Sequence, residues 1–219
     1  MRLASRRSAL RATTPIRADS VVIVFARAPL AGQVKTRLAP RIGAERAARL
    51  HRQLILTAVR TAKDARCGPV ELHMTRRHAL FPRAKLQKGR DLGERMHHAL
   101  RGALRRHRSA ILIGSDCPSL KPADLRRAVR SLQGGADVVL APADDGGYAL
   151  VGASRMAPQV FSGVRWGSAE VLAQTVANLT RARLEFRLLR TVWDVDRPED
   201  LERLRARRFS LAAPQGARR

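Results

Sequence analysis

Carboxylates are scarce in this sequence, and several of them gather where short apolar runs end. The chain has 18 acidic residues, and Asp116, Asp144, Asp145, Asp194 and Asp196 are five of them. Asp116 follows the apolar run 110–113 after Gly114 and Ser115. Carboxylates beside phosphate-binding groups hold Mg²⁺ or Mn²⁺, hard cations that prefer oxygen ligands. The spacing therefore predicts a metal site with Asp116 as one ligand.

A second acidic ligand is expected near residue 195. Asp194 and Asp196 lie in the segment WDVD, and alternation along an extended chain places both on one side. Either could complete a site with Asp116. Asp196 is also placed to cap a last helix that begins near Pro198, which leaves Asp194 as the favoured ligand.

A basic loop follows the first apolar run, 21–26. It carries Arg27, Lys35 and Arg37 and has no acid until Glu45. Cations before a helix N-terminus can form an anion site, and an ordinary basic surface loop is the alternative. The loop matches neither a Walker A motif nor a dinucleotide G-x-G-x-x-G motif. These comparisons argue against a P-loop nucleotidase and against hydride transfer.

Two further segments combine glycines with polar side chains. Gln87 precedes a glycine-containing turn into a helix, and its amide could read the edge of a base. Asp144 and Asp145 precede Gly146 and Gly147, a pattern typical of a hairpin turn that also lets a ligand approach the backbone. The six histidines show no zinc-ligand spacing, and no nucleophile elbow occurs.

The elements that must position these residues alternate along the chain. Strands are expected at 21–26, 69–74, 110–113, 136–141, 148–152 and 184–189, and helices at 43–65, 92–106, 122–132, 168–179 and from about 198. Helices of 10–20 residues between strands predict a three-layer, doubly wound α/β fold with a mostly parallel sheet of six or seven strands. The short link before 148–152 indicates an antiparallel strand. One domain, 20–205, is expected between a basic arm (1–19) and a basic tail (206–219), both predicted to be disordered.

Composition narrows the classes of function. The chain has 219 residues and a formal net charge of +25, with 45% hydrophobic and 4% aromatic residues. The excess charge is spread over the chain and comes mainly from arginine, which argues against specific nucleic-acid binding. No apolar run is long enough to span a bilayer. The arginine- and serine-rich N-terminus also has the composition of a transit peptide, but two cysteines fit a reducing compartment, so we expect a cytoplasmic protein.

Six ordered blocks carry a family resemblance. They are FARAPLAGQVKTRL, DLGERMHHAL, LIGSDCPSL, ADDGGYALVG, RWGSAEVLAQT and WDVDRPEDL. Over about residues 20–204 the chain resembles the selenodomain-associated transferases, a group of unknown function within the nucleotide-diphospho-sugar transferase superfamily. That resemblance implies a Rossmann-like fold of the glycosyltransferase A type. The chain is also similar to 2-phospholactate and molybdenum-cofactor guanylyltransferases, although it lacks the Gly-Gly-x-Ser-x-Arg-Met loop of many nucleotidyltransferases.

The resemblance implies roles for particular residues. Lys35 and Arg37, with Arg27, would bind phosphates, Gln87 and Gly93 the base, and Asp116 with Asp194 or Asp196 the metal. Lys35, Asp116 and Asp145 are the expected catalytic residues, and Gly146, Gly147 and Trp166 the expected acceptor contacts.

The expected activity is a Mg²⁺- or Mn²⁺-dependent transfer from a nucleotide-sugar donor to a small-molecule acceptor. Nucleotidyl transfer from a nucleoside triphosphate is the alternative, and a noncatalytic nucleotide- or nucleic-acid-binding module is the alternative of another class.

Overall fold

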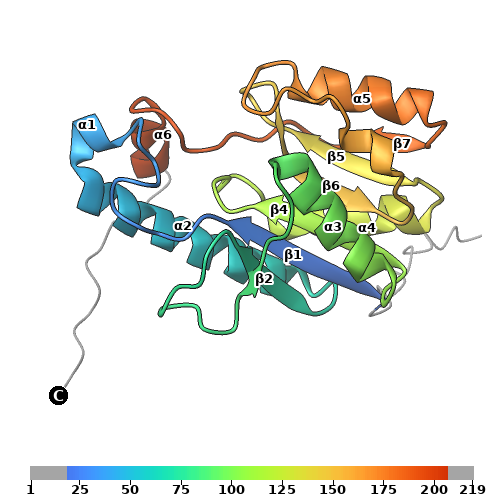
Figure 1. Ribbon diagram of the computed structural model, residues 1–219, viewed down its shortest axis with the longest axis horizontal. Coiled ribbons are helices and arrows are strands. Elements are labelled where there is room, and N and C mark those ends of the chain that lie inside the picture. The colour runs from blue at the N-terminus through green and yellow to red at the C-terminus, as the bar shows by residue number, and fades with distance from the viewer. Residues whose placement is uncertain (1–18, 207–219) are drawn as a thin grey trace, which may run out of the picture.

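The computed structural model of the protein describes residues 19–206, which form a seven-stranded sheet between two layers of helices (Figure 1). The strands are β1 (Ser20–Ala26), β2 (Val70–Met74), β3 (Lys85–Leu86), β4 (Ser109–Gly114), β5 (Val138–Pro142), β6 (Tyr148–Ala153) and β7 (Phe186–Leu188). The predicted basic arm (1–19) and basic tail (206–219) lie outside the described residues, except for Asp19 and Ala206.

The strand order is β3-β2-β1-β4-β6-β5-β7. All neighbouring strands are parallel except β6, which runs antiparallel to β4 and β5. The prediction of a mostly parallel sheet of six or seven strands with one antiparallel strand is confirmed. β3 was not expected, because a two-residue edge strand has no periodicity that a sequence can show.

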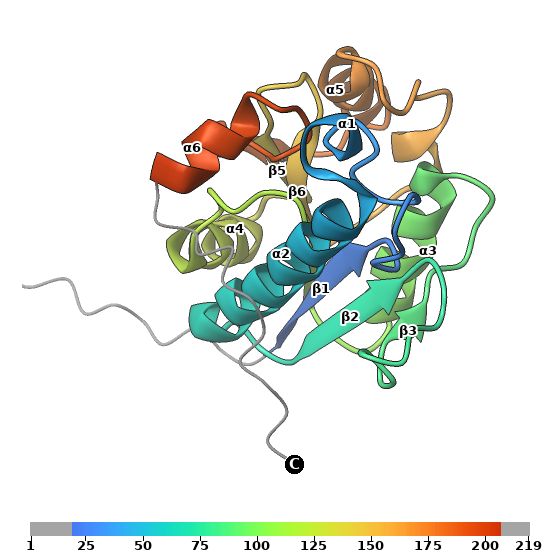
Figure 2. The same cartoon turned by 90° about the vertical axis from the view of Figure 1, so that its left-hand side faces the viewer.

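The helices are α1 (Ala39–Ile42), α2 (Ala44–Ala65), α3 (Leu92–Leu104), α4 (Pro122–Gln133), α5 (Val171–Arg181) and α6 (Asp200–Ala206), with a 3₁₀ turn, η1, at Pro158–Phe161. Alternate residues of β1 face opposite layers: Val22 and Val24 pack toward α2 and α4, whereas Val21 and Ile23 pack toward α3 and α5. Figure 2 shows α2 and α4 on the face of the sheet turned away from α3. A strand buried on both faces explains the continuous apolar run at 21–26.

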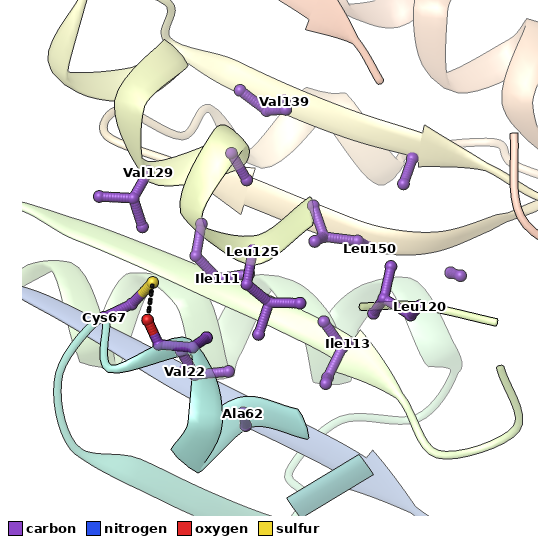
Figure 3. Close-up of a cluster of buried hydrophobic side chains, with 14 of the residues drawn as sticks. Val22, Ala62, Cys67, Ile111, Ile113, Leu120, Leu125, Val129, Val139 and Leu150 are labelled. Carbon is purple, nitrogen blue, oxygen red and sulfur yellow. Dashed lines mark hydrogen bonds between the residues drawn. The ribbon is translucent and has the colours of Figure 1, made fainter. Parts of the chain in front are cut away.

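The core between the sheet, α2 and α4 is made of small and branched side chains (Figure 3). Ile111, Ile113, Leu125 and Leu150 are almost completely buried there. Cys67 lies at the same core, and its Sγ is 3.6 Å from the Ala65 carbonyl oxygen. Both cysteines are free thiols. No helix among residues 19–206 is long and apolar enough to cross a membrane.

The last helix begins later than predicted, and Asp196 does not cap it. α6 starts at Asp200, whose own carboxylate accepts hydrogen bonds from the backbone N–H groups of Asp196 and Arg197 at 3.0 and 2.7 Å. The Asp196 carboxylate is paired with Arg37 instead. The prediction was wrong because the helix begins four residues after Asp196, whose carboxylate instead meets an arginine 159 residues away that no local pattern reveals.

Candidate functional site

The loop after β1 turns its lysine into the protein. Lys35 has a left-handed backbone (φ 49°), a conformation that costs a non-glycine residue about 1 kcal/mol and is often found at functional sites. Only 4% of its side chain is exposed. Its Nζ lies 2.8 Å from Asp116 Oδ2 and donates to the Val195 carbonyl oxygen at 2.6 Å. Lys35 therefore joins three segments that are far apart in the sequence.

Asp116 stands just beyond the end of β4, as predicted. The backbone N–H of Ser115 continues the strand pairing by donating to the Phe25 carbonyl oxygen, and Ser115 Oγ lies 3.2 Å from Asp116 Oδ1. Burial alone would raise the pKa of Asp116, but the Lys35 ammonium and His51 hold it well below its usual value. The carboxylate is thus ionised, and 39% of its side chain remains exposed.

His51 is a site residue that sequence reasoning missed. It comes from α2, its residue exposure is 2%, and its Nδ1 lies 3.3 Å from Asp116 Oδ1. Its Nε2 is 3.2 Å from the Arg27 carbonyl oxygen. The available signal was its place on the apolar stripe of the helix, between Ala47 and Leu54, where a polar side chain needs a partner in the core.

The segment after β7 is fastened to the loop after β4. Ser119 Oγ donates to the Trp193 carbonyl oxygen at 2.8 Å and accepts from the Trp193 N–H at 2.9 Å. Arg190 reaches Asp124 through Nε at 2.8 Å and through its terminal nitrogen at 2.5 Å. The Val195 N–H donates to the Asp116 carbonyl oxygen at 2.9 Å. These bonds bring Asp194 to the same edge of the sheet as Asp116.

Asp194 lies among like charges. Burial, Asp145 and, to a smaller extent, Asp116 raise the pKa of Asp194 to about 6, while Lys35 opposes the increase. Asp145 sits in the β5–β6 turn, where its Oδ1 accepts a hydrogen bond from the Gly147 N–H at 2.9 Å. Asp194 is therefore close enough to two other predicted site carboxylates, Asp116 and Asp145, to be affected by their charges.

The predicted arginines stand at the rim. Arg37 is exposed and donates to Asp196 Oδ2 at 2.7 Å. Arg27 is exposed as well, and its guanidinium lies 3.5 Å from the Gln33 carbonyl oxygen. Asp196 is thus engaged by an arginine at the rim, whereas Asp194 is the residue that faces the other carboxylates.

The residues expected to hold the base lie on the β2 side of the site. Gln87 Nε2 donates to the Ala26 and His73 carbonyl oxygens at 3.2 and 3.1 Å, so its amide bridges the ends of β1 and β2. Its side-chain oxygen is the atom left to meet a ligand. Gln87 also lines a pocket of about 460 Å³ between α3 and the β2–β3 edge.

Gly93 and the predicted acceptor contacts form a packed group. A Cβ on Gly93 would lie 2.8 Å from the Trp166 ring, and the Tyr148 ring meets Trp166 edge-on at 6.5 Å between centroids. Gly146 has a φ of +86°, and a Cβ there would lie 2.2 Å from the Ala169 carbonyl oxygen. Both glycines are therefore required for close approach between backbone segments or rings, independently of any ligand.

The carboxylates of the site fit a hard divalent cation whose coordination shell is completed by substrate oxygens. Within residues 19–206, no three acidic, histidine or cysteine side chains are close enough to enclose an ion by themselves. Mg²⁺ is usually held by one or two carboxylates together with substrate phosphates. A cation bound beside Asp194 would offset the burial and the neighbouring like charges that raise its pKa. Asp116 and Asp194 are thus the residues that could hold the metal.

Comparisons with known proteins agree with this architecture. The model of the family described as "Uncharacterized protein conserved in bacteria (DUF2064)" matches residues 44–168. No curated protein matches the chain. A crystal structure of a presumed nucleotide-diphospho-sugar transferase from Desulfovibrio desulfuricans G20 is 32% identical, with a TM-score of 0.75 over 82% of this chain and 83% of that one.

More distant structures share the fold. A CMP-2-keto-3-deoxy-manno-octonic acid synthetase in complex with CTP is 13% identical, with a TM-score of 0.58 over 87% of this chain and 98% of that one. Rv0371c from Mycobacterium tuberculosis H37Rv, in complex with manganese, is 19% identical, with a TM-score of 0.51 over 85% and 97% of the two chains. The predicted Rossmann-like fold of the nucleotide-diphospho-sugar transferases is confirmed.

Proposed function

The chain belongs to the DUF2064 family, and we propose that it is a metal-dependent transferase with a nucleotide-activated donor. The observation that carries this proposal is the contact between Lys35 and Asp116, in the loops that follow β1 and β4. In open α/β sheets, ligands bind beyond the carboxyl ends of the strands. A cation-binding carboxylate and a phosphate-binding ammonium meet there. The narrower assignment to the selenodomain-associated transferases stays a prediction.

Lys35 can bind a phosphate without leaving Asp116. An ammonium group has three N–H donors, and two of them are directed to Asp116 and to the Val195 carbonyl oxygen. The third remains for a phosphate oxygen of the donor. Arg37 and Arg27 stand exposed at the rim, where they would meet the outer part of the same diphosphate. Their positive charge would also favour the approach of an anionic donor.

The carboxylates would hold the metal and meet the acceptor. Asp116 and Asp194 are the proposed ligands, and the bound metal would neutralise the charge that develops on the leaving phosphates. Asp145 is exposed, and the Gly147 N–H fixes one of its oxygens. In glycosyl transfer, Asp145 would orient or deprotonate an acceptor hydroxyl beside Gly146 and Gly147, and Trp166 would be a further acceptor contact. We favour glycosyl transfer from a nucleotide sugar because that reaction gives the exposed Asp145 carboxylate a role with the acceptor.

Nucleotidyl transfer would use the same phosphate and metal groups. There an acceptor phosphate attacks the α-phosphorus of a nucleoside triphosphate, and pyrophosphate leaves. The two reactions differ in their products, which are a nucleoside diphosphate for glycosyl transfer and pyrophosphate for nucleotidyl transfer. Product analysis with a panel of acceptors therefore decides between them.

The first experiment measures thermal shifts with nucleotide sugars and nucleoside triphosphates, each with and without Mn²⁺. A ligand that binds only the native state raises the unfolding temperature by mass action. Asp116→Asn should abolish the metal-dependent part of the shift while the circular dichroism spectrum stays unchanged. Asp64→Asn, an exposed change near the far end of α2, is the matched control. Unchanged metal-dependent binding by Asp116→Asn would rule out the assignment.

A further inference from the structure

His51 is a polar residue in the apolar face of the longest helix. Its residue exposure is 2%, and its neighbours along that face include Ala47, Leu50, Leu54 and Ile55, all of them buried. A buried imidazole has two ring nitrogens that need polar partners, and leaving either nitrogen without one lowers the stability of the fold. An apolar side chain of similar size would pack at this position without that requirement. The partners of the two nitrogens therefore indicate why a histidine stands there.

The two nitrogens face different parts of the site. Nε2 lies 3.2 Å from the Arg27 carbonyl oxygen, and because a carbonyl can only accept, Nε2 is the donor in that bond. Nδ1 lies 3.3 Å from Asp116 Oδ1, an ion-pair contact of the protonated ring in which Nδ1 is the second N–H group, although it lacks the alignment of a hydrogen bond. Polar contacts in ligand-free active sites are often long or poorly aligned and shorten when substrate binds. His51 thus links the start of the basic loop to the Asp116 carboxylate.

Three side chains approach this carboxylate from different directions. Lys35 contacts Oδ2 at 2.8 Å, while Ser115 Oγ and His51 Nδ1 approach Oδ1 at 3.2 and 3.3 Å. Ser115 is the adjacent residue and moves with Asp116, and the Lys35 ammonium would be shared with a bound phosphate. His51 comes from a helix of 22 residues that packs against the sheet. Of the three, only His51 lies on a helix.

We propose that His51 is a positioning residue that keeps the Asp116 carboxylate in one orientation, with the Arg27 carbonyl as the second contact of its ring. This inference rests on the proposed function, in which Asp116 holds the metal and the loop holds the phosphates. Partners that orient a metal ligand typically change metal affinity 10- to 100-fold when they are removed. Loss of His51 should therefore weaken metal binding without unfolding the protein.

Three substitutions separate the two contacts of the ring. His51→Asn keeps an amide near the position of Nδ1, on the Asp116 side. His51→Gln keeps an amide near the position of Nε2, on the Arg27 side. His51→Leu keeps the packing volume and removes both polar contacts. Binding of Mn²⁺ in the presence of saturating inorganic pyrophosphate is followed by electron paramagnetic resonance, and each unfolding temperature is measured alongside.

We expect His51→Asn to stay within about threefold of the wild-type Mn²⁺ affinity although its smaller side chain lowers the unfolding temperature. His51→Gln and His51→Leu should lose about 10- to 100-fold in affinity, and His51→Leu should do so at an unfolding temperature near that of the wild type. The changes in Mn²⁺ affinity would then not follow the changes in unfolding temperature. Equal affinity in all three variants, or equal losses that follow the unfolding temperature, would overturn the proposal.

Crystal structures of His51→Asn and His51→Leu separate this inference from the proposed function. We expect Asp116 to keep its contact with Lys35 in the first variant and to change its orientation in the second. If the wild type binds no Mn²⁺ with pyrophosphate but Asp116 moves in His51→Leu, the positioning role stands and the metal assignment falls. If Asp116 is unmoved in His51→Leu, the positioning role is refuted whatever the metal does.

Discussion

The Lys35 ammonium lies 2.8 Å from Asp116 Oδ2, and this contact joins two loops that are 81 residues apart in the sequence. The lysine is almost completely buried, whereas the carboxylate keeps an open face. A buried ammonium needs a compensating charge, and an ionised carboxylate at the end of β4 provides it. The pair therefore fixes the basic loop against the sheet edge and leaves Asp116 accessible.

Lys35→Met should weaken the binding of pyrophosphate about 10- to 100-fold, because a hydrogen bond from a charged group contributes about 1.5–3 kcal/mol. Lys35→Arg should not restore binding, since the planar guanidinium is larger than the enclosed ammonium. Lys63→Met, an exposed change on α2 that removes the same charge, is the control. Isothermal titration calorimetry measures the three affinities. Equal weakening by Lys63→Met would show that net charge, and not this site, binds the anion.

Asp194 and Asp196 should differ as metal ligands. Asp194 faces Asp145 and Asp116, whereas Asp196 is paired with the exposed Arg37. We expect Asp194→Asn to weaken Mn²⁺ binding in the presence of pyrophosphate at least tenfold and Asp196→Asn to change it less than threefold. Electron paramagnetic resonance of free Mn²⁺ measures both. The reverse ranking would assign the metal to Asp196.

Gly146→Ala should destabilise the protein more than Gly167→Ala. Both glycines have a φ of +86°, so an alanine suffers the same backbone strain of about 1 kcal/mol at either position. A Cβ on Gly146 would also lie 2.2 Å from a backbone oxygen of Ala169, whereas a Cβ on Gly167 meets nothing within 4 Å. We expect Gly146→Ala to cost about 2 kcal/mol or more beyond the control. Urea denaturation measures the difference, and equal costs would show that the β5–β6 turn can shift.

Glu71 should make stability depend on pH in the acid range. Burial would raise its pKa, but hydrogen bonds from Lys85 and His73 lower it from 4.5 to about 2. A lowered folded-state pKa stabilises the fold above pH 4.5, and this stabilisation is lost as the pH falls from about 4.5 to about 2. The wild type should therefore lose up to about 3 kcal/mol more than Glu71→Gln across this range. Urea denaturation at pH 6 and pH 3 measures about 2 kcal/mol of this loss, because the folded-state carboxyl is still mostly ionised at pH 3. Parallel curves for the two proteins would contradict the prediction.

Part of the site was predictable because its signals are local. Asp116 lies two residues beyond a buried strand, and the basic residues of 27–37 follow another, so the rule for parallel sheets places both at one edge. The apolar runs and helical stripes likewise indicated every strand except β3 and all the long helices. Burial of one or both faces of an element imposes its helical or strand periodicity on the local sequence, independently of the rest of the chain.

The pairings between segments depended on the tertiary structure. His51 shows no ligand spacing along the chain, and it reaches Asp116 because α2 crosses the sheet beside the end of β4. Arg37 forms an ion pair with Asp196, which is 159 residues away in the sequence. Arg190 binds Asp124 and thereby positions the segment that carries Asp194. The sequence alone determined the helices and strands and the types of side chain that follow them. Strand order and helix packing decided which of these ends meet, because contacts between distant residues leave no periodicity in the sequence.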